Sequence, residues 1–198
     1  MSLFFETLRV EEGKLFNLEG HTRRLHRTRY EIFGLDTPLD LAAFIGPVPT
    51  RGLYRCRVLY DRELRSVEFH PYRGRDLGSF RLVHSSIRYP HKAAHRREID
   101  ELFAGRGAAD DILIVSPEGL LRDTSIANIA LKLGGRWWTP SAPLLPGTMR
   151  EKLLNEGFIE ERELFVEDLK SAESFAVMNA MVGFSEIADP RFLYGSGR

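Results

Sequence analysis

A loop that runs directly into a helical pattern constrains the fold of this chain more than any other feature. Residues 137–140 read as an extended segment, Pro146 and Gly147 end it, and a helical pattern follows them. The first N–H groups of a helix lack partners inside the helix, and the helix dipole adds partial positive charge there. We therefore predict an anion-binding site, suited to a phosphate, at Gly147 and Thr148.

Polar side chains are concentrated shortly before this loop. Asp123, Ser125 and Asn128 lie close together in the sequence, next to the apolar run 129–131. An exposed turn would also place an acid at Asp123, and this is the simpler explanation of that residue taken alone. Buried polar groups need hydrogen-bond partners, however, so polar side chains beside an apolar run indicate a shared site.

Lys92 is unusual because the chain contains 23 arginines but only five lysines. Most positions that need only a positive charge are filled by arginine, and Lys92 follows a predicted strand. A surface lysine is the simplest interpretation of such a residue. Only a primary amine can form an imine, however, and an amine, a buried acid and a phosphate site are the groups that pyridoxal phosphate requires.

Two further residues each leave two interpretations open. Arg24 shares a helix face with His21 at i, i+3 spacing, so it is either an exposed charge or a fork for a phosphate. Asn179 ends the apolar run 175–178, where a strand cap and a ligand contact are equally compatible with the sequence.

The length of the chain allows one large domain or two small ones, and the pattern of elements favours two. A polar, glycine-rich linker at residues 72–79 separates an α+β first domain, 1–74, from a larger second domain, 75–198, that carries Lys92. The first domain is expected to contain strands at 4–10, 15–18, 52–60 and 66–72 and helices at 21–33 and from residue 37. The second is expected to contain strands at 80–89, 112–115, 120–121, 126–133, 136–139, 163–166 and 174–178 and helices at 94–103, 148–155 and from residue 168.

Composition and charge exclude several classes of protein. The net charge is zero, with a basic first half and an acidic second half, and the arginines form no nucleic-acid-binding motif, so no nucleic acid is expected. No apolar stretch is long enough to cross a membrane, and no signal peptide is evident. Cys56 is the only cysteine, and the six histidines lack metal-ligand spacing, so we expect a cytoplasmic protein without a metal.

Ten separated segments, in the right order, resemble the class IV aminotransferase family, the fold type IV pyridoxal-phosphate enzymes. This family includes branched-chain and D-amino-acid aminotransferases and 4-amino-4-deoxychorismate lyase, and the lyase is the member that the chain resembles most. The segments are 5–9, 13–14, 21–25, 92, 111–113, 119–128, 139–140, 145–150, 168–169 and 178–180. The resemblance implies an α+β, two-domain, D-amino-acid aminotransferase-like fold with the cofactor at the domain interface.

The resemblance also implies roles for single residues. Lys92 would form the Schiff base with pyridoxal 5'-phosphate and then move protons, for which it must be partly deprotonated. Asp123 would face the pyridine nitrogen, Arg24 would grip the phosphate, and Arg9 would bind a substrate carboxylate. The remaining expected cofactor contacts are Ser125, Asn128, Gly147, Thr148, Met149, Asn179 and Ala180.

The chain departs from the family pattern in two places. Asp123 occupies a position where the family carries a glutamate, so its carboxylate is one methylene shorter. The chain also begins inside the first conserved segment of the family, so we expect a truncated first domain whose missing pocket walls could come from a partner subunit. The resemblance also implies a homodimer.

Three functions remain open. The arginine-rich first domain suits a dicarboxylate, so we place a lyase that releases pyruvate and 4-aminobenzoate first. A class IV aminotransferase acting on a branched-chain or D-amino acid is the alternative, because it would use the same residues. The third is a non-catalytic relative that binds the cofactor. In the first two, the partner is a small amino-acid-like substrate.

Overall fold

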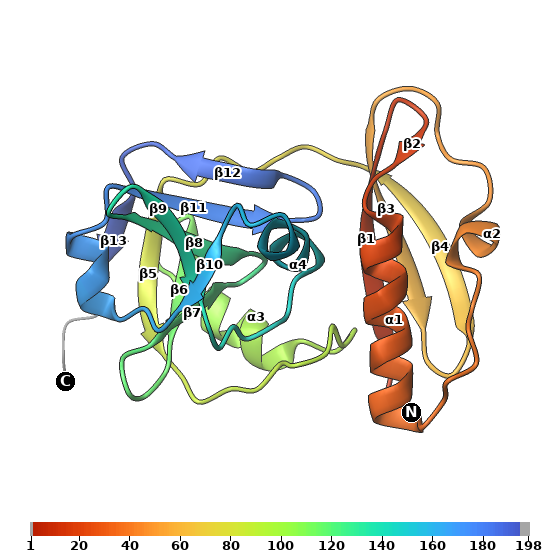
Figure 1. Ribbon diagram of the computed structural model, residues 1–198, viewed down its shortest axis with the longest axis horizontal. Coiled ribbons are helices and arrows are strands. Elements are labelled where there is room, and N and C mark those ends of the chain that lie inside the picture. The colour runs from red at the N-terminus through yellow and green to blue at the C-terminus, as the bar shows by residue number, and fades with distance from the viewer. Residues whose placement is uncertain (1, 195–198) are drawn as a thin grey trace. The chain divides into compact units, whose positions relative to one another are not determined.

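The computed structural model describes residues 2–194, which divide into two compact units (Figure 1). Unit 1 combines the chain up to Gly74 with His91–His95, and unit 2 combines Arg75–Pro90 with the chain from Arg96 onward. Lys92 thus belongs to unit 1, and our assignment of it to the second domain was wrong. The reason is backbone pairing, because Lys92 O accepts a hydrogen bond from Phe5 N at 3.0 Å.

Unit 1 is a four-stranded antiparallel sheet with a long helix on one face (Figure 1). The strand order is β2-β1-β3-β4. Its elements are β1 (Phe4–Glu11), β2 (Lys14–Leu15), α1 (Leu18–Phe33), α2 (Leu41–Ile45), β3 (Leu53–Tyr60) and β4 (Leu64–Pro71). The expected strands and the long helix of this unit are therefore present, with bounds that differ by a few residues.

The alternation of β1 explains how the sheet packs on α1. Phe4, Leu8 and Val10 are buried on the inner face, and the residues between them point to the other face. Glu6 is the exception, since it is an acid in register with the apolar residues and is itself completely buried. Gly34 ends α1 in a left-handed conformation with φ 66°, which glycine adopts without strain.

Unit 2 contains a nine-stranded mixed sheet. Its elements are β5 (Ser79–His84), α3 (Arg97–Ala104), β6 (Asp111–Val115), β7 (Leu121–Thr124), β8 (Asn128–Leu133), β9 (Arg136–Pro140), α4 (Thr148–Asn155), β10 (Glu160–Arg162), the 3-10 helix η1 (Val166–Lys170), β11 (Ser174–Asn179), β12 (Gly183–Ile187) and β13 (Arg191–Leu193). The strand order is β10-β9-β8-β7-β6-β5-β13, and β11 pairs with both β8 and β12.

Three strands of unit 2 differ from the sequence-based prediction. The strand expected at 163–166 is reduced to an isolated bridge between Leu120 and Phe165, and a short strand lies just before it, at β10, where exposed residues pair in parallel with β9. Neither β12 nor β13 was predicted. All three are edge strands stabilised by backbone pairing with a neighbour, and such pairing leaves little apolar pattern in the sequence.

The mixed α and β architecture agrees with the expected fold class. Each unit has its own buried apolar cluster, around Leu8 and Tyr60 in unit 1 and around Phe80 and Phe175 in unit 2. Among residues 2–194, no helix has the length and apolar character needed to cross a bilayer.

Candidate active site

The expected site residues lie in both units. Unit 1 carries Arg9, Arg24 and Lys92, and unit 2 carries all the others. Those of unit 2 are Asp123, Ser125, Asn128, Gly147, Thr148, Met149, Asn179 and Ala180.

In unit 1, Arg24 is held by a buried carboxylate. The Arg24 side chain comes from α1 and is only 5% exposed. Its Nε donates to Glu6 Oε1 at 2.9 Å, and its Nη2 donates to Glu6 Oε2, so the contact is bidentate. His21 lies one turn earlier on α1 and places Nδ1 at 2.6 Å from Glu6 Oε2. Arg24 is thus not an exposed charge, which was one of the two interpretations that its sequence position allowed.

The electrostatics of this cluster favour an ionised acid and a neutral imidazole. Burial acts to raise the pKa of Glu6, but the charge of Arg24 and the His21 hydrogen bond outweigh it and lower the pKa to about 2. Burial lowers the pKa of His21 below its usual value, although Glu6 acts in the opposite direction. His21 is therefore neutral at pH 7, and its Nδ1–H donates to the Glu6 carboxylate.

Lys92 lies in a loop of unit 1 that runs beside the start of β1. Its carbonyl accepts from Phe5 N, and its Nζ lies 4.7 Å from the centre of the Phe5 ring. This is a cation–π distance, at which the Phe5 ring attracts a positive charge on the amine. The positive charge of Lys92 also contributes to the lowered pKa of His21.

The face of the sheet opposite α1 is rich in arginine. Arg9 of β1 pairs directly with Arg55 of β3, and Arg57 follows two residues later on the same face. Arg9 forms an ion pair with Glu11 at 2.8 Å, whereas Arg57 lies 4.0 Å from Glu68. Like charges directly opposite each other destabilise a sheet, so this arrangement favours binding of an anion.

In unit 2, one hydrogen-bond network joins the acid to the loop before α4. Asp123 and Asn128 are paired across β7 and β8. Asn128 Nδ2 donates to Asp123 Oδ1 and to Leu145 O, both at 2.8 Å, and Leu145 N donates to Asp123 Oδ2 at 2.8 Å. The position of the carboxylate is therefore tied to the position of the loop.

Burial dominates the acidity of Asp123. It raises the pKa to about 6, although the hydrogen bonds from Asn128 and Leu145 and the charge of Arg150 act to lower it. A carboxyl group in such a site gains from a nearby cation. A protonated pyridine nitrogen would supply one.

Gly147 allows the amide of Asn128 to reach this network. It is the N-cap of α4 and has an ordinary extended conformation, with φ −73° and ψ 143°. A Cβ at Gly147 would lie 2.0 Å from Asn128 Oδ1, so the glycine is required for space rather than for its backbone angles. Thr148 begins the eight-residue helix and is 3% exposed. The helix N-terminus predicted from the sequence is therefore present.

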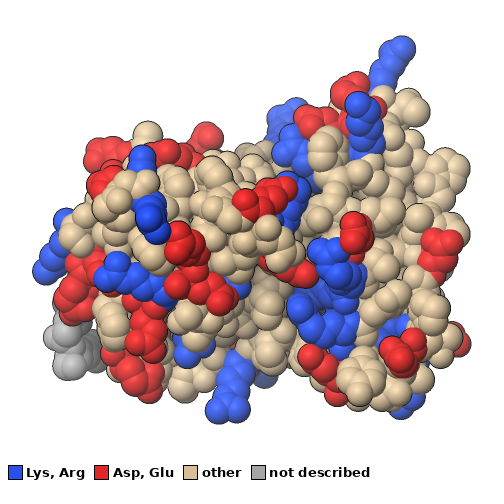
Figure 2. All heavy atoms as spheres, viewed as in Figure 1, with Lys and Arg blue, Asp and Glu red and all other residues tan. Residues whose placement is uncertain are grey.

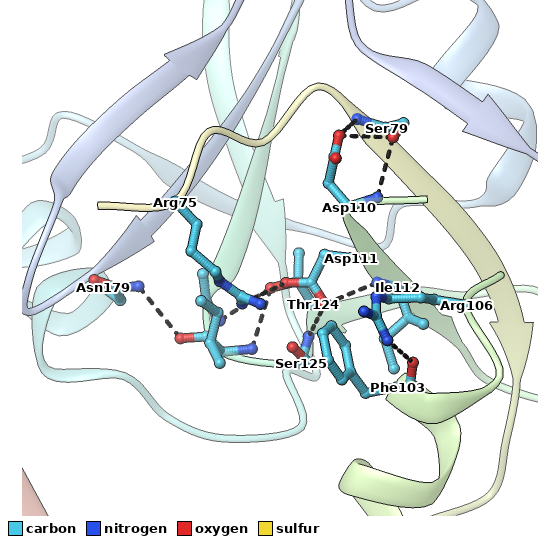
Figure 3. A network of polar contacts seen from close by, with 12 residues as sticks. Arg75, Ser79, Phe103, Arg106, Asp110, Asp111, Ile112, Thr124, Ser125 and Asn179 are labelled. Atoms are coloured by element: carbon cyan, nitrogen blue, oxygen red, sulfur yellow. Dashed lines mark hydrogen bonds and ion pairs between the residues drawn. The ribbon is translucent and has the colours of Figure 1, made fainter. Parts of the chain in front are cut away.

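Ser125 is positioned through its backbone. Figure 3 shows Asp111 between Arg75 and Ser125, with the Ser125 N–H 3.4 Å from Asp111 Oδ1. The Ser125 carbonyl accepts from Arg96 Nη2 at 2.8 Å. Arg75 Nη2 lies 3.6 Å from Asp111 Oδ2. These contacts fix the turn between Asp123 and Asn128.

The other expected contacts lie at the ends of α4 and β11. Asn179 Oδ1 accepts from Met181 N and Val182 N, so its side chain caps the turn that contains Ala180. Its Nδ2 is directed toward Ile126 O at 3.4 Å (Figure 3). Met149 packs against the apolar cluster of unit 2 around Ala130 and Leu153. The strand-cap interpretation of Asn179 is therefore correct, and its contact with a ligand stays a prediction.

Sequence reasoning missed several residues of these two groups. They are Phe5, Glu6, Arg55, Arg57, Asp111 and the backbone of Leu145. Glu6 had a usable signal, because it interrupts the apolar alternation of β1. The Leu145 backbone had none, since its role follows from the position of the loop.

Comparisons of the sequence and of the structure with known proteins point to the same family. The sequence model described as amino-transferase class IV matches residues 64–189. An uncharacterized protein of Haemophilus influenzae is 38% identical over 184 residues, a match that covers 90% of this chain and 97% of that protein.

Two other relatives have more informative names. A Schizosaccharomyces pombe protein proposed as an aminodeoxychorismate lyase is 36% identical over 160 residues, and the match covers 78% of this chain but only 62% of that protein. A solved structure from Haemophilus somnus, proposed as a 4-amino-4-deoxychorismate lyase, is 31% identical with a TM-score of 0.85. That match covers 92% of this chain and 98% of the other.

Proposed function

Since the chain belongs to the amino-transferase class IV family, we propose that it is a pyridoxal-phosphate enzyme that releases pyruvate and 4-aminobenzoate from 4-amino-4-deoxychorismate. The observation that carries this proposal is the buried Asp123, which is hydrogen-bonded both to Asn128 and to the loop before α4. A carboxylate and a helix N-terminus joined in one network suit a ligand with a basic ring and a phosphate.

The donor set of the described residues fits pyridoxal phosphate. Lys92 provides the primary amine, and Asp123 is a buried acid whose oxygens each accept one hydrogen bond from a donor within unit 2. The N-terminus of α4 and the guanidinium of Arg24 provide positive ends for a phosphate.

Each of these residues has a separate task in the proposed reaction. The bound cofactor supplies a ring that accepts electrons from the substrate carbon. Lys92 attaches the cofactor and removes a proton from the substrate, Asp123 keeps the ring nitrogen protonated, and Arg24 retains the phosphate. In this role Asp123 is ionised, because a cation beside a buried carboxyl group lowers its pKa.

The substrate class is supported by the arginine-rich face of unit 1. Arg9, Arg55 and Arg57 lie on adjacent strands of one sheet face. Guanidinium groups bind carboxylates through two parallel hydrogen bonds. Three such groups suit a substrate with two carboxylates better than a branched-chain amino acid, which favours the lyase.

An aminotransferase is the second candidate, supported by the description of the matching family model. Lys92, Asp123 and Arg24 would serve it equally well, because both reactions begin with removal of a proton from the same carbon. The two differ in whether a keto acid is needed as amino acceptor. A product assay therefore separates them.

The test is an assay with 4-amino-4-deoxychorismate and pyridoxal phosphate in the absence of any keto acid. We expect fluorescence from 4-aminobenzoate and an equal amount of pyruvate. Activity that depends strictly on a keto acid, with a new amino acid as product, would replace the lyase by the aminotransferase. Cofactor binding without turnover of either substrate class would indicate that the chain is a non-catalytic relative that only binds the cofactor.

A further inference from the structure

Glu6 is a charged residue in a position that the fold would fill with an apolar one. It lies on the inner face of β1 between Phe4 and Leu8, and it is completely buried beneath α1. Its two oxygens receive Nε and Nη2 of Arg24 and Nδ1 of His21. Both donors come from one face of α1, three residues apart.

Stability alone does not account for this cluster. Removing two charges from water is costly, and apolar residues of similar volume often stabilise a core as well or better. What a buried bidentate pair provides is geometry, because a planar guanidinium held along one edge has a fixed orientation. Glu6 occupies the Nε–Nη2 edge of Arg24, so the Nη1 side is directed away from Glu6.

His21 fixes the carboxylate in turn. Its neutral ring donates Nδ1–H to Glu6 Oε2, the same oxygen that accepts from Arg24 Nη2. Each Glu6 oxygen therefore has at least one donor, and rotation of the carboxylate would break bonds to both partners. His21 therefore fixes the Glu6 carboxylate, and the carboxylate fixes the orientation of Arg24.

We propose that Glu6 is a positioning residue that orients Arg24 for the phosphate group of the cofactor. This inference rests on the proposed function, in which Arg24 binds that phosphate. It predicts that Glu6 affects only ligands that carry the phosphate. Pyridoxal, which has the same ring and aldehyde but no phosphate, is the matched ligand.

The experiment compares the binding of pyridoxal phosphate and pyridoxal by absorbance titration in wild type and Glu6→Gln. Gln keeps the shape of the side chain but removes the charge and replaces one acceptor with a donor. We expect pyridoxal phosphate to bind about tenfold more weakly in the variant, whereas pyridoxal affinity stays within about twofold. Asp61→Asn is the control, because it removes another carboxylate partner of an arginine in unit 1, Arg65, at 2.9 Å.

Protein stability is measured in parallel by thermal unfolding. If Glu6→Gln does not fold, Glu6→Asp serves in its place, since it keeps the charge and withdraws the carboxylate by one methylene. A folded variant at this position that keeps the wild-type ratio of the two affinities would overturn the proposal. An equal loss for both ligands would also overturn it, because it indicates a purely structural role.

The same titrations distinguish a failure of the proposed function from a failure of the role proposed for Glu6. If wild type shows no preference for pyridoxal phosphate over pyridoxal, then the phosphate site itself is absent and Arg24 does not have the role assumed here. If wild type shows the preference and Glu6→Gln keeps it, only the role of Glu6 is lost.

Discussion

At the scale of single residues, burial strongly changes the acidity of Asp123. Its pKa is raised from 3.8 to about 6 by burial, so without cofactor the folded protein keeps the proton on Asp123 to a higher pH than the unfolded chain does. A raised pKa stabilises the folded state fully below the unfolded value. That contribution is lost as pH rises through the folded value.

The resulting prediction concerns Asp123→Asn in the absence of cofactor. The unfolding free energy of wild type, relative to the variant, should fall by roughly 2 kcal/mol between pH 4 and pH 7. Urea unfolding at several pH values measures this difference and cancels the contribution of other groups. A difference that does not change with pH would contradict the burial of an ionisable group at this position.

The contribution of Glu6 to the free energy of unfolding should depend on pH in the opposite direction. Its pKa is lowered from 4.5 to about 2, so it contributes stability above pH 4.5 that is lost as pH falls toward 2. Relative to Glu6→Gln, wild type should lose roughly 3 kcal/mol over this range. The same urea experiment at acid pH provides the measurement, and an increase in relative stability on acidification would contradict the ion pair with Arg24.

At the scale of elements, the joint between β8 and α4 is the most constrained part of unit 2. Asn128 on β8 connects Asp123 to Leu145, and Gly147 leaves room for its amide. A substitution at Gly147, the N-cap of α4, should therefore shift the carboxylate of Asp123 on β7.

Gly147→Ala tests this joint. The new Cβ would overlap Asn128 Oδ1, so the amide must move, and we expect a loss of about 1 to 3 kcal/mol in unfolding free energy. Cofactor affinity should fall as well, because the carboxylate of Asp123 loses its fixed position. Gly74→Ala is the matched control, since no atom lies within 4 Å of a Cβ there. Equal stability of the two variants would show that Asn128 adapts freely.

The same elements show how far the sequence alone could be interpreted. β1 and α1 follow from their periodicity and from Gly34, and Asp123 and Asn128 were expected in one site because they lie close together in the chain. Lys92 was assigned to the wrong unit, since its position depends on hydrogen bonds between backbones distant in sequence. Long-range pairing of this kind leaves no trace in local composition, and the edge strands β10, β12 and β13 were misplaced or missed for a similar reason.

At the scale of the whole molecule, charge is distributed unevenly. Lys and Arg side chains gather over α1 on the face of unit 1 seen in Figure 2, while Asp and Glu are prominent on unit 2. Within unit 1, the opposite sheet face adds Arg9, Arg55 and Arg57. Such a field attracts anionic ligands, and salt weakens it.

Arg55→Gln tests the use of this field in substrate binding. We expect KM for 4-amino-4-deoxychorismate to rise about tenfold with little change in kcat, because the lost carboxylate contact stabilises the bound substrate and the transition state equally. Stability should not fall, since the substitution removes repulsion between Arg9 and Arg55. Arg51→Gln, an exposed change in the loop before β3, is the control and should leave KM unchanged. Equal KM values for the two variants would remove Arg55 from substrate recognition.

We propose above all that this chain holds pyridoxal phosphate covalently through Lys92. The most direct test adds the cofactor, reduces the complex with borohydride and maps the modified peptide by mass spectrometry. We expect one phosphopyridoxyl group per chain, attached to Lys92 and absent from Lys92→Ala. Modification of another lysine, or no stable modification in a folded wild-type protein, would contradict it.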